Sequence, residues 1–310
     1  MVREINEDDE TYEVPAFVRT MNCVQGMKKI PTGSVDVVVT SPPYNLGKKY
    51  GKYMDRRDQK EYLNWCQQWA IQVRRVLKEN GSFFLNLGSS PSNPTIPHEL
   101  LANLIGRGIA SDLEPFVLQN TIHWIKAITV IDDNGAELSK GHFKPINSDR
   151  FVNDCHEYIF HLTPKGTTEL DRKAIGVAYK YKSNIKRWGH TKGNDKRCRG
   201  NTWFIPYHTI QSSKRDRPHP ASFPPELPEN CIRLHGSGRE TVVLDPFLGI
   251  GNSWIASIRC QVGKFYGFDL DKEYVGLARK YVKDDSIVWP GKPPVDESGE
   301  DFSDVFFNPG

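Results

Sequence analysis

The stretch from Glu240 to Val282 constrains the fold of this chain more than any other part of its 310 residues. A short apolar strand pattern ends at Asp245, a turn with Gly249 and Gly251 follows, and helix, strand and helix patterns come after it. A strand joined to a parallel neighbour through a helix is typical of α/β sheets. The stretch therefore predicts a mostly parallel sheet with helices on both faces.

The rest of the chain continues this alternation. Strands are predicted at 34–39, 82–87, 119–127 and 156–162, and helices at 61–80, where Gly81 ends the pattern, and at 96–105. No long apolar run is present, which excludes a membrane span, and the first residues are too acidic for a signal peptide. We expect a soluble cytoplasmic protein with one compact body and an insertion, associated with the nucleoid if the host is a prokaryote.

The insertion is the basic part of the chain. Residues 172–217 hold thirteen Lys or Arg and two Asp, a local charge of +11 that leaves −8 on the remaining residues. Cations mixed with Tyr and Trp suit phosphates and bases, so the segment is a candidate contact for nucleic acid. A solvated loop with a few buried rings is the alternative. The candidate DNA-binding residues are Lys186, Arg187, Arg197, Arg199, Lys214 and Arg215.

Metal chemistry is not indicated. The six cysteines include no CxxC pair, which argues against a zinc site and against a disulfide framework. His156, Glu157 and His161 form an HExxxH spacing, which does not place two histidines together as HExxH does. We therefore expect no metal and reduced thiols.

The glycine turn predicts a bound adenosine group. Gly249 and Gly251 let a ligand approach the free N–H groups of the following helix. Asp269 stands eighteen residues beyond Gly251, at the end of the next strand, where a carboxylate can accept both ribose hydroxyls. The spacing is not GxGxxG, which counts against NAD, and a purely structural tight turn is the alternative.

A second motif, Thr-Ser-Pro-Pro-Tyr at 40–44, follows the strand predicted at 34–39. Two prolines make a rigid corner at the carboxyl end of that strand, which is where open α/β sheets bind ligands. The Ser41 hydroxyl and the Pro42 carbonyl can accept the two hydrogens of an exocyclic amine, and Tyr44 offers a ring for stacking. In isolation, a proline-stiffened loop is the better explanation of the motif.

Together these motifs resemble the β class of S-adenosylmethionine-dependent DNA amino-methyltransferases, in which the catalytic tetrapeptide precedes the cofactor glycines. Ser41 precedes Gly249 here in the same way, and the resemblance runs from Thr20 to Val282. It implies a circularly permuted, Rossmann-like methyltransferase fold with a mostly parallel seven-stranded sheet. The implied organisation is an acidic arm at 1–19, a catalytic half at 20–163, a basic target-recognition region at 164–218, a cofactor half at 219–282 and an acidic tail at 283–310.

The resemblance also assigns residues. The implied catalytic residues are Ser41, Pro42, Pro43 and Tyr44, and the implied cofactor-binding residues are Asn22, Phe223, Asp245, Phe247, Gly249, Gly251, Asn252 and Asp269. The family often has Thr where Asn252 stands, and Gly-Asp where Met21 and Asn22 stand. Both asparagines still offer hydrogen bonds, and Asn22 is expected to pair with an adenine amine.

The implied function is methylation of the N4 amine of cytosine in duplex DNA, with S-adenosylmethionine as cofactor. Ser before the prolines commonly accompanies cytosine in this family, whereas Asp accompanies adenine. A separately acting restriction endonuclease is a possible partner. Adenine N6 methylation, RNA or protein methylation, and a non-catalytic DNA-binding module with this fold remain alternatives.

Overall fold

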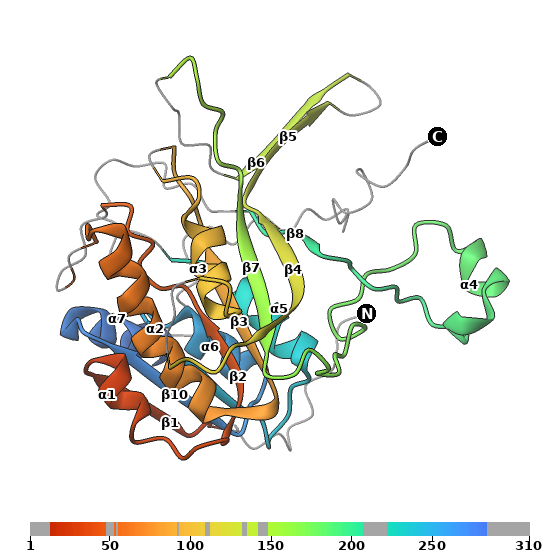
Figure 1. The fold of residues 1–310 in the computed structure, drawn as a ribbon. Coiled ribbons are helices and arrows are strands. Elements are labelled where there is room, and N and C mark those ends of the chain that lie inside the picture. The colour runs from red at the N-terminus through yellow and green to blue at the C-terminus, as the bar shows by residue number, and fades with distance from the viewer. Residues whose placement is uncertain are drawn as a thin grey trace.

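The main feature of the computed structural model is an eight-stranded sheet in the order β1-β10-β9-β2-β3-β7-β4-β8 (Figure 1). The structure describes residues 13–47, 53, 55–91, 93–108, 112–131, 135–141, 148–206 and 222–283. The sheet strands are β1 (Ala16–Thr20), β2 (Val35–Thr40), β3 (Leu77–Leu87), β4 (Val117–Ile125), β7 (His156–Thr163), β8 (Thr202–Phe204), β9 (Val242–Asp245) and β10 (Lys264–Asp269). Only β7 runs antiparallel to its neighbours, so the predicted mostly parallel sheet is confirmed.

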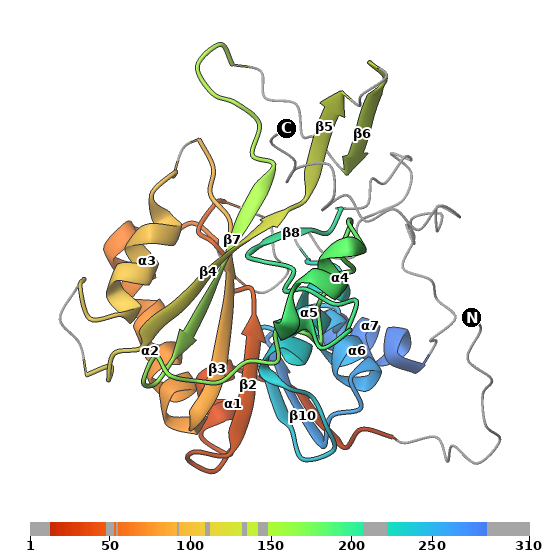
Figure 2. The ribbon, with the colours of Figure 1, turned by 90° about the vertical axis from the view of Figure 1, so that its right-hand side faces the viewer.

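Helices cover both faces of this sheet (Figure 2). Apolar residues of α1, α2 and α3 fill one core, and those of α5, α6 and α7 fill the other. The helices are α1 (Cys23–Met27), α2 (Gln59–Val76), α3 (Ile96–Leu104), α4 (Ser183–Arg187), α5 (Glu226–His235), α6 (Asn252–Arg259) and α7 (Lys272–Lys283), with a 3₁₀ turn, η1, at Gly189–Thr191. The predicted three-layer α/β fold is therefore confirmed.

Strand β2 shows why the sequence places the proline corner at the centre of the sheet. All four of its valines are fully buried, with Val38 in one core and Val37 and Val39 in the other. A strand buried on both faces reads as a continuous apolar run. It lies between β9 and β3, so the corner after Thr40 opens at the carboxyl edge beside the glycine turn after β9.

The sheet has one strand more than the seven that were predicted. The additional strand is β8, which comes from the basic segment and pairs in parallel with β4 at the sheet edge. The Trp124 indole donates a 2.7 Å hydrogen bond to the Ile205 carbonyl just after β8, and Trp203 of β8 is fully buried. The basic segment is thus tied to the body by its own apolar residues.

The predicted helix at 61–80 was wrong at its carboxyl end. The helix ends at Val76, because Leu77 has extended backbone angles and already pairs with Val35 in the sheet. Strand β3 therefore begins at Leu77 instead of Ser82. Leu77 continued the helical apolar spacing, so the sequence pattern alone did not reveal the change.

Two further elements lie where no strand was predicted. Residues 16–19, assigned to an N-terminal arm, belong to the edge strand β1, which pairs with β10. The strand predicted at 119–127 ends at Ile125, and after Lys126 the chain forms a separate hairpin of β5 (Ala127–Ile131) and β6 (Glu137–Gly141). The basic residues after 206 and the tail after 283 lie outside the described residues.

A polar cluster joins β3, β4, β7 and α5. His161 Nδ1 lies 3.0 Å from the Asn120 amide, His161 Nε2 lies 3.0 Å from Ser82 Oγ, and His235 Nδ1 lies 2.9 Å from the same hydroxyl. Since the Asn120 amide donates to Nδ1, the other nitrogen of His161 carries the proton and the ring is neutral. Burial lowers the pKa of His161 to about 3 and also lowers the pKa of His235.

This cluster predicts a loss of stability on acidification. Unfolded His161 takes up a proton below about pH 6.5 whereas the folded residue does not, so its contribution is complete above that pH and declines towards pH 3. Replacing His161 with Gln should reduce the loss of unfolding free energy between pH 7 and pH 5 by about 2 kcal/mol. Urea unfolding at both pH values measures it, with exposed His98→Gln as control. Equal losses in the parent and His161→Gln would contradict the assignment.

Candidate active site and cofactor pocket

The glycine turn after β9 forms one wall of a pocket at the carboxyl edge of the sheet. Gly249 and Gly251 have positive φ angles of 52° and 89°, which favour glycine. A Cβ on Gly251 would lie 2.7 Å from the Ala278 Cβ, so α6 and α7 pack closely only because this position lacks a side chain. Gly249 lines the pocket, whereas Gly251 does not.

Both motifs of the sequence line this one pocket. Its residues come from the proline corner, the glycine turn, the end of β10 and the segment before α5, together with α1, α2, α7 and Tyr53. Of the predicted site residues, it is lined by Ser41, Pro43, Asn22, Phe223, Phe247, Gly249, Asn252 and Asp269. Pro42, Tyr44, Asp245 and Gly251 are absent from the lining.

Asp269 lies where the sequence predicted it, at the end of β10 and in the pocket. Its Oδ2 accepts the Gly249 backbone N–H at 2.9 Å, and its Oδ1 accepts the Asp271 backbone N–H at 2.8 Å. Burial raises the pKa of Asp269, while these backbone bonds oppose that shift. Each carboxylate oxygen keeps acceptor capacity for a ligand hydroxyl, and the same side chain also holds the glycine turn.

Asp245 is buried behind the pocket and hydrogen-bonds to residues around it. Its carboxylate accepts hydrogen bonds from Thr40 Oγ1 at 2.6 Å, Ser253 Oγ at 2.5 Å and the Phe247 backbone N–H at 2.9 Å. Burial raises its pKa to about 6. Asp245 was predicted to bind the cofactor; in the structure its side chain lies outside the pocket lining and ties β2 to the glycine turn.

The two asparagines of the pocket differ in which of their side-chain atoms are already hydrogen-bonded. Asn22 Oδ1 caps α1 by accepting the Val24 and Gln25 backbone N–H groups at 2.9 and 3.4 Å, so the atom that an adenine amine would need is already engaged. Asn252 donates a 2.6 Å hydrogen bond to the Phe223 carbonyl, which ties the segment before α5 to the glycine turn. Its Oδ1 is buried without a hydrogen-bond partner among the described residues.

An aromatic wall was missed by the sequence analysis. Trp65 of α2 lies 5.6 Å from the Phe247 ring and 5.1 Å from the Tyr53 ring, measured between centroids, and all three residues line the pocket. Trp65 lies within the helix predicted at 61–80 and was not among the predicted site residues. Helical spacing indicates burial and does not reveal that one end of the buried stripe faces a ligand site.

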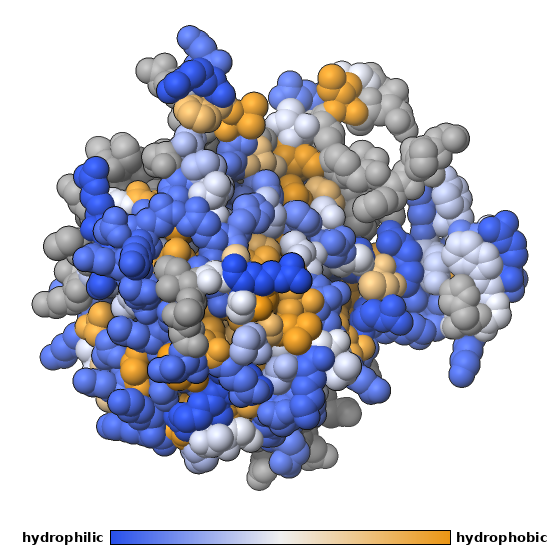
Figure 3. All heavy atoms as spheres, viewed as in Figure 1, coloured by the Kyte–Doolittle hydropathy of each residue, from blue (hydrophilic) through white to orange (hydrophobic). Residues whose placement is uncertain are grey.

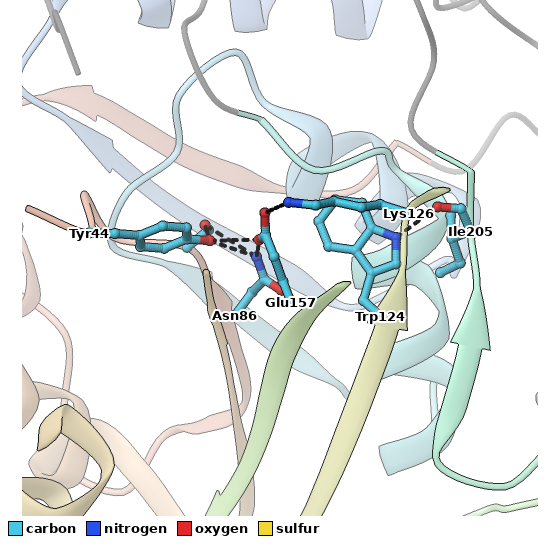
Figure 4. A network of polar contacts seen from close by, with 7 residues as sticks. Tyr44, Asn86, Trp124, Lys126, Glu157 and Ile205 are labelled. Carbon is cyan, nitrogen blue, oxygen red and sulfur yellow. Dashed lines mark hydrogen bonds and ion pairs between the residues drawn. The ribbon is translucent and has the colours of Figure 1, made fainter. Parts of the chain in front are cut away.

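The proline corner carries a hydrogen-bond network that also escaped the sequence analysis (Figure 4). Ser41 Oγ lies 2.5 Å from the Tyr44 hydroxyl, which donates to Glu157 Oε2 at 3.1 Å. The Asn86 amide nitrogen donates to the Tyr44 hydroxyl at 2.7 Å and to Glu157 Oε2 at 2.8 Å. Lys126 Nζ lies 2.8 Å from Glu157 Oε1. Glu157 had been considered only in the rejected metal motif.

The described part of the basic segment, up to residue 206, forms a lobe beside the body, around α4 (Figure 1). Hydrophilic side chains dominate the visible surface of this lobe (Figure 3). Lys186 and Arg187 are exposed on α4, and the Arg187 guanidinium lies 5.4 Å above the exposed Trp188 ring. Arg197 and Arg199 are half-buried, and Arg199 Nε donates to the Ile175 carbonyl at 3.1 Å. The predicted contacts Lys214 and Arg215 lie outside the described residues.

Two features are absent from the described part of the chain. No group of three or more His, Cys, Asp or Glu side chains is placed to hold a metal ion within it. Among the helices described there, none is long and apolar enough to cross a membrane.

The chain was compared with protein families and with curated proteins. The N6_N4_Mtase family model, described as DNA methylase, matches residues 35–280. Type II methyltransferase M.BglII of Bacillus subtilis is 30% identical over 257 residues, which are 80% of this chain and 64% of M.BglII. The chain thus spans less than two thirds of that relative. DNA adenine methyltransferase YhdJ of Escherichia coli is 28% identical over 264 residues, covering 82% of this chain and 78% of YhdJ.

Solved structures show the same fold. PvuII DNA methyltransferase (cytosine-N4-specific) superposes with a TM-score of 0.60 at 19% identity, over 86% of this chain and 85% of that one. TTHA0409 of Thermus thermophilus, complexed with S-adenosyl-L-methionine, superposes with a TM-score of 0.55 at 21% identity, over 86% and 92%. With a family model matched over most of its length, the chain belongs to the N6_N4_Mtase family of DNA methylases.

Proposed function

We propose that this chain transfers a methyl group from S-adenosylmethionine to the exocyclic N4 amine of cytosine within a specific sequence of duplex DNA. The observation that carries the proposal is that the proline corner and the glycine turn line one pocket. A cofactor bound at Gly249 and Asp269 is thereby placed next to a target amine held at Ser41. Most of the rate enhancement would come from this positioning.

The residues of the pocket fit S-adenosylmethionine. Asp269 would accept ribose hydroxyls, the aromatic wall of Trp65 and Phe247 would cover apolar parts of the ligand, and the unpartnered Asn252 Oδ1 would accept from its ammonium group. When bound, this cofactor supplies an electrophilic methyl group on a sulfonium ion. The solved complex of TTHA0409 with the same cofactor supports the assignment.

The target amine must leave the base stack to reach this pocket. Extruding a base from duplex DNA costs a few kcal/mol, which contacts in the enzyme must offset. Ser41 would accept from the amine, the Pro42 carbonyl would accept its second hydrogen, and the Tyr44 ring would lie against the base. Ser41 at the corner and the name of the PvuII enzyme favour cytosine.

Adenine N6 is the second candidate target, because YhdJ is named as a DNA adenine methyltransferase. A restriction endonuclease that acts on the same sequence is the proposed partner system, since M.BglII is named as a Type II methyltransferase. The proline corner itself serves either amine, because cytosine N4 and adenine N6 are both exocyclic NH₂ groups.

Transfer of tritium from methyl-labelled cofactor tests the proposed function. Mixed-sequence duplex DNA, RNA and protein are offered in parallel, and only DNA is expected to become labelled. Label in RNA or protein alone would move the assignment to another methyltransferase class. A folded protein that labels nothing while binding DNA would favour the non-catalytic module.

The α4 lobe is expected to supply much of the DNA affinity. Lys186 and Arg187 are exposed there, and their positive charges attract the phosphate groups of DNA. Each phosphate contact contributes about 0.9 to the slope of log K against log salt. Replacing Lys186 and Arg187 with Gln should therefore reduce that slope by about 2. Fluorescence anisotropy of labelled duplex DNA at several salt concentrations measures the change.

Two variants serve as comparisons for this prediction. Lys28 and Lys29 are exposed near α1, away from α4 in Figure 1, and their replacement with Gln makes the same change in charge. That pair should leave the slope unchanged. Arg197 and Arg199 should affect it less than the α4 pair does, since Arg199 already binds a backbone carbonyl. An unchanged slope for the α4 pair would place the DNA contact elsewhere.

A further inference from the structure

We propose that Glu157, paired with Lys126, fixes the direction of the hydrogen-bond chain at the proline corner and receives the proton that the target amine releases. Glu157 acts through Tyr44 and Ser41 and does not touch the substrate. This inference rests on the proposed function, and it gives roles to Glu157 and Lys126, which belong neither to the proline corner nor to the glycine turn.

The direction of the chain follows from which groups can donate. Lys126 Nζ contacts Glu157 Oε1, and the Asn86 amide donates to Oε2, so the carboxylate is an acceptor on both oxygens. The Tyr44 hydroxyl donates its single hydrogen to Glu157 Oε2 at 3.1 Å. With that hydrogen engaged, the 2.5 Å contact between Tyr44 Oη and Ser41 Oγ has the Ser41 hydroxyl as its donor.

Ser41 therefore presents only lone pairs to the pocket that it lines. An amine hydrogen needs an acceptor, and a serine hydroxyl is otherwise free to turn and act as a donor. The ionised Glu157 removes that freedom through Tyr44. An ionised carboxylate can only accept hydrogen bonds. The contact with Tyr44 restricts the Ser41 hydroxyl to the same acceptor role towards the pocket.

The same contacts offer a path for the proton. As the amine nitrogen bonds to the methyl carbon, the carbon–sulfur bond breaks with its electron pair on sulfur, and the nitrogen becomes positively charged. Its surplus proton passes to Ser41 Oγ, the Ser41 proton passes to Tyr44 Oη, and the Tyr44 proton passes to Glu157 Oε2. The charge of the nitrogen makes its proton acidic enough for a carboxylate to accept.

The surroundings of Glu157 hold this arrangement in place. The Glu157 side chain is 14% exposed, and a Cβ on Gly88 would lie 3.0 Å from the Tyr44 ring and 3.1 Å from the Glu157 carboxyl carbon. The titratable groups that interact with Glu157 are Lys126 after β4, Tyr44 at the corner and the preceding residue His156 on the same strand. Burial acts to raise the pKa of Glu157, but the Lys126 ammonium and the Asn86 and Tyr44 hydrogen bonds lower it overall.

A double-mutant cycle tests whether Glu157 works through Tyr44. Glu157→Gln and Tyr44→Phe should each lower kcat about 100-fold, as expected when a proton acceptor is lost. The double variant should be no slower than the slower single variant, because both break the same chain. Glu79→Gln, at the exposed ion pair with Lys165, is the matched control and should keep the parent kcat. Losses that multiply in the double variant, or a kcat of Glu157→Gln within twofold of the parent, would overturn the proposal.

Lys126 gives an independent test. Lys126→Met should raise the pKa of Glu157, so the acid limb of the pH profile of kcat should move to higher pH, and Lys126→Arg should restore it. The infrared carboxylate band in the difference spectrum of parent minus Glu157→Gln reports the same ionisation in the protein alone. A protonated Glu157 at pH 7, or an acid limb that Lys126→Met leaves in place, would overturn the proposal. A parent that transfers no methyl group would refute the proposed function, while the infrared band would still decide whether Glu157 is ionised.

Discussion

Replacing Ser41 with alanine should lower the rate of methyl transfer about 100-fold, the typical cost of removing one hydrogen-bonding group from a reacting centre. Ser41 is the first residue of the proline corner and lines the pocket, and its hydroxyl is assigned to the target amine. No contact to the cofactor is assigned to it. The dissociation constant of S-adenosylmethionine should therefore stay within about twofold of the parent value.

Single-turnover kinetics with excess enzyme and calorimetry with the cofactor measure the two quantities separately. Ser89→Ala is the matched control, since it removes a half-buried hydroxyl from the neighbouring loop after β3. It should change neither quantity. Equal losses of rate and of cofactor affinity in Ser41→Ala would mean that the hydroxyl supports the pocket and does not act on the target.

Replacing Asp269 with alanine should weaken S-adenosylmethionine binding about 100-fold, or roughly 3 kcal/mol. Two separate losses together cause this weaker binding. The ribose hydroxyls lose a charged acceptor, and the Gly249 and Asp271 backbone N–H groups lose the carboxylate that holds them in place. The turn that approaches the ligand is therefore expected to loosen together with the direct contact.

Calorimetry on the folded variant measures this loss. Glu273→Ala removes an exposed carboxylate two residues beyond Asp271 and should bind the cofactor as the parent does. Circular dichroism and the unfolding midpoint show whether Asp269→Ala keeps its fold. An unchanged dissociation constant in a folded Asp269→Ala protein would refute the cofactor site.

Much of the fold could be predicted because the motifs coincide with strand ends. The runs that form β2 and β9 are mostly apolar, and each ends at its motif, so their parallel pairing brings Ser41 and Gly249 to one pocket. The apolar spacing of α2 likewise predicted a buried helix. These features are local in the sequence and depend on its periodicity alone.

The rest depends on contacts between distant residues. Asn86 and Glu157 are 71 positions apart, and Thr40 and Asp245 are 205 positions apart. No local pattern distinguishes Glu157 from an exposed strand residue until antiparallel pairing brings β7 beside β3. At Leu77 the local pattern was misleading. The apolar spacing favoured a helix there, but Leu77 pairs with Val35 and belongs to a strand.

Mass spectrometry of nucleosides is the most direct test of the claim that the proline corner presents a base amine to the cofactor. Duplex DNA is incubated with the protein and S-adenosylmethionine carrying a deuterated methyl group, then digested completely and compared with a Ser41→Ala reaction. The predicted result is deuterated N4-methylcytosine in the parent reaction and a strong reduction of it in the variant. N6-methyladenine as the sole product would contradict the cytosine assignment, and label on cytosine C5 or on no base at all would contradict the claim itself.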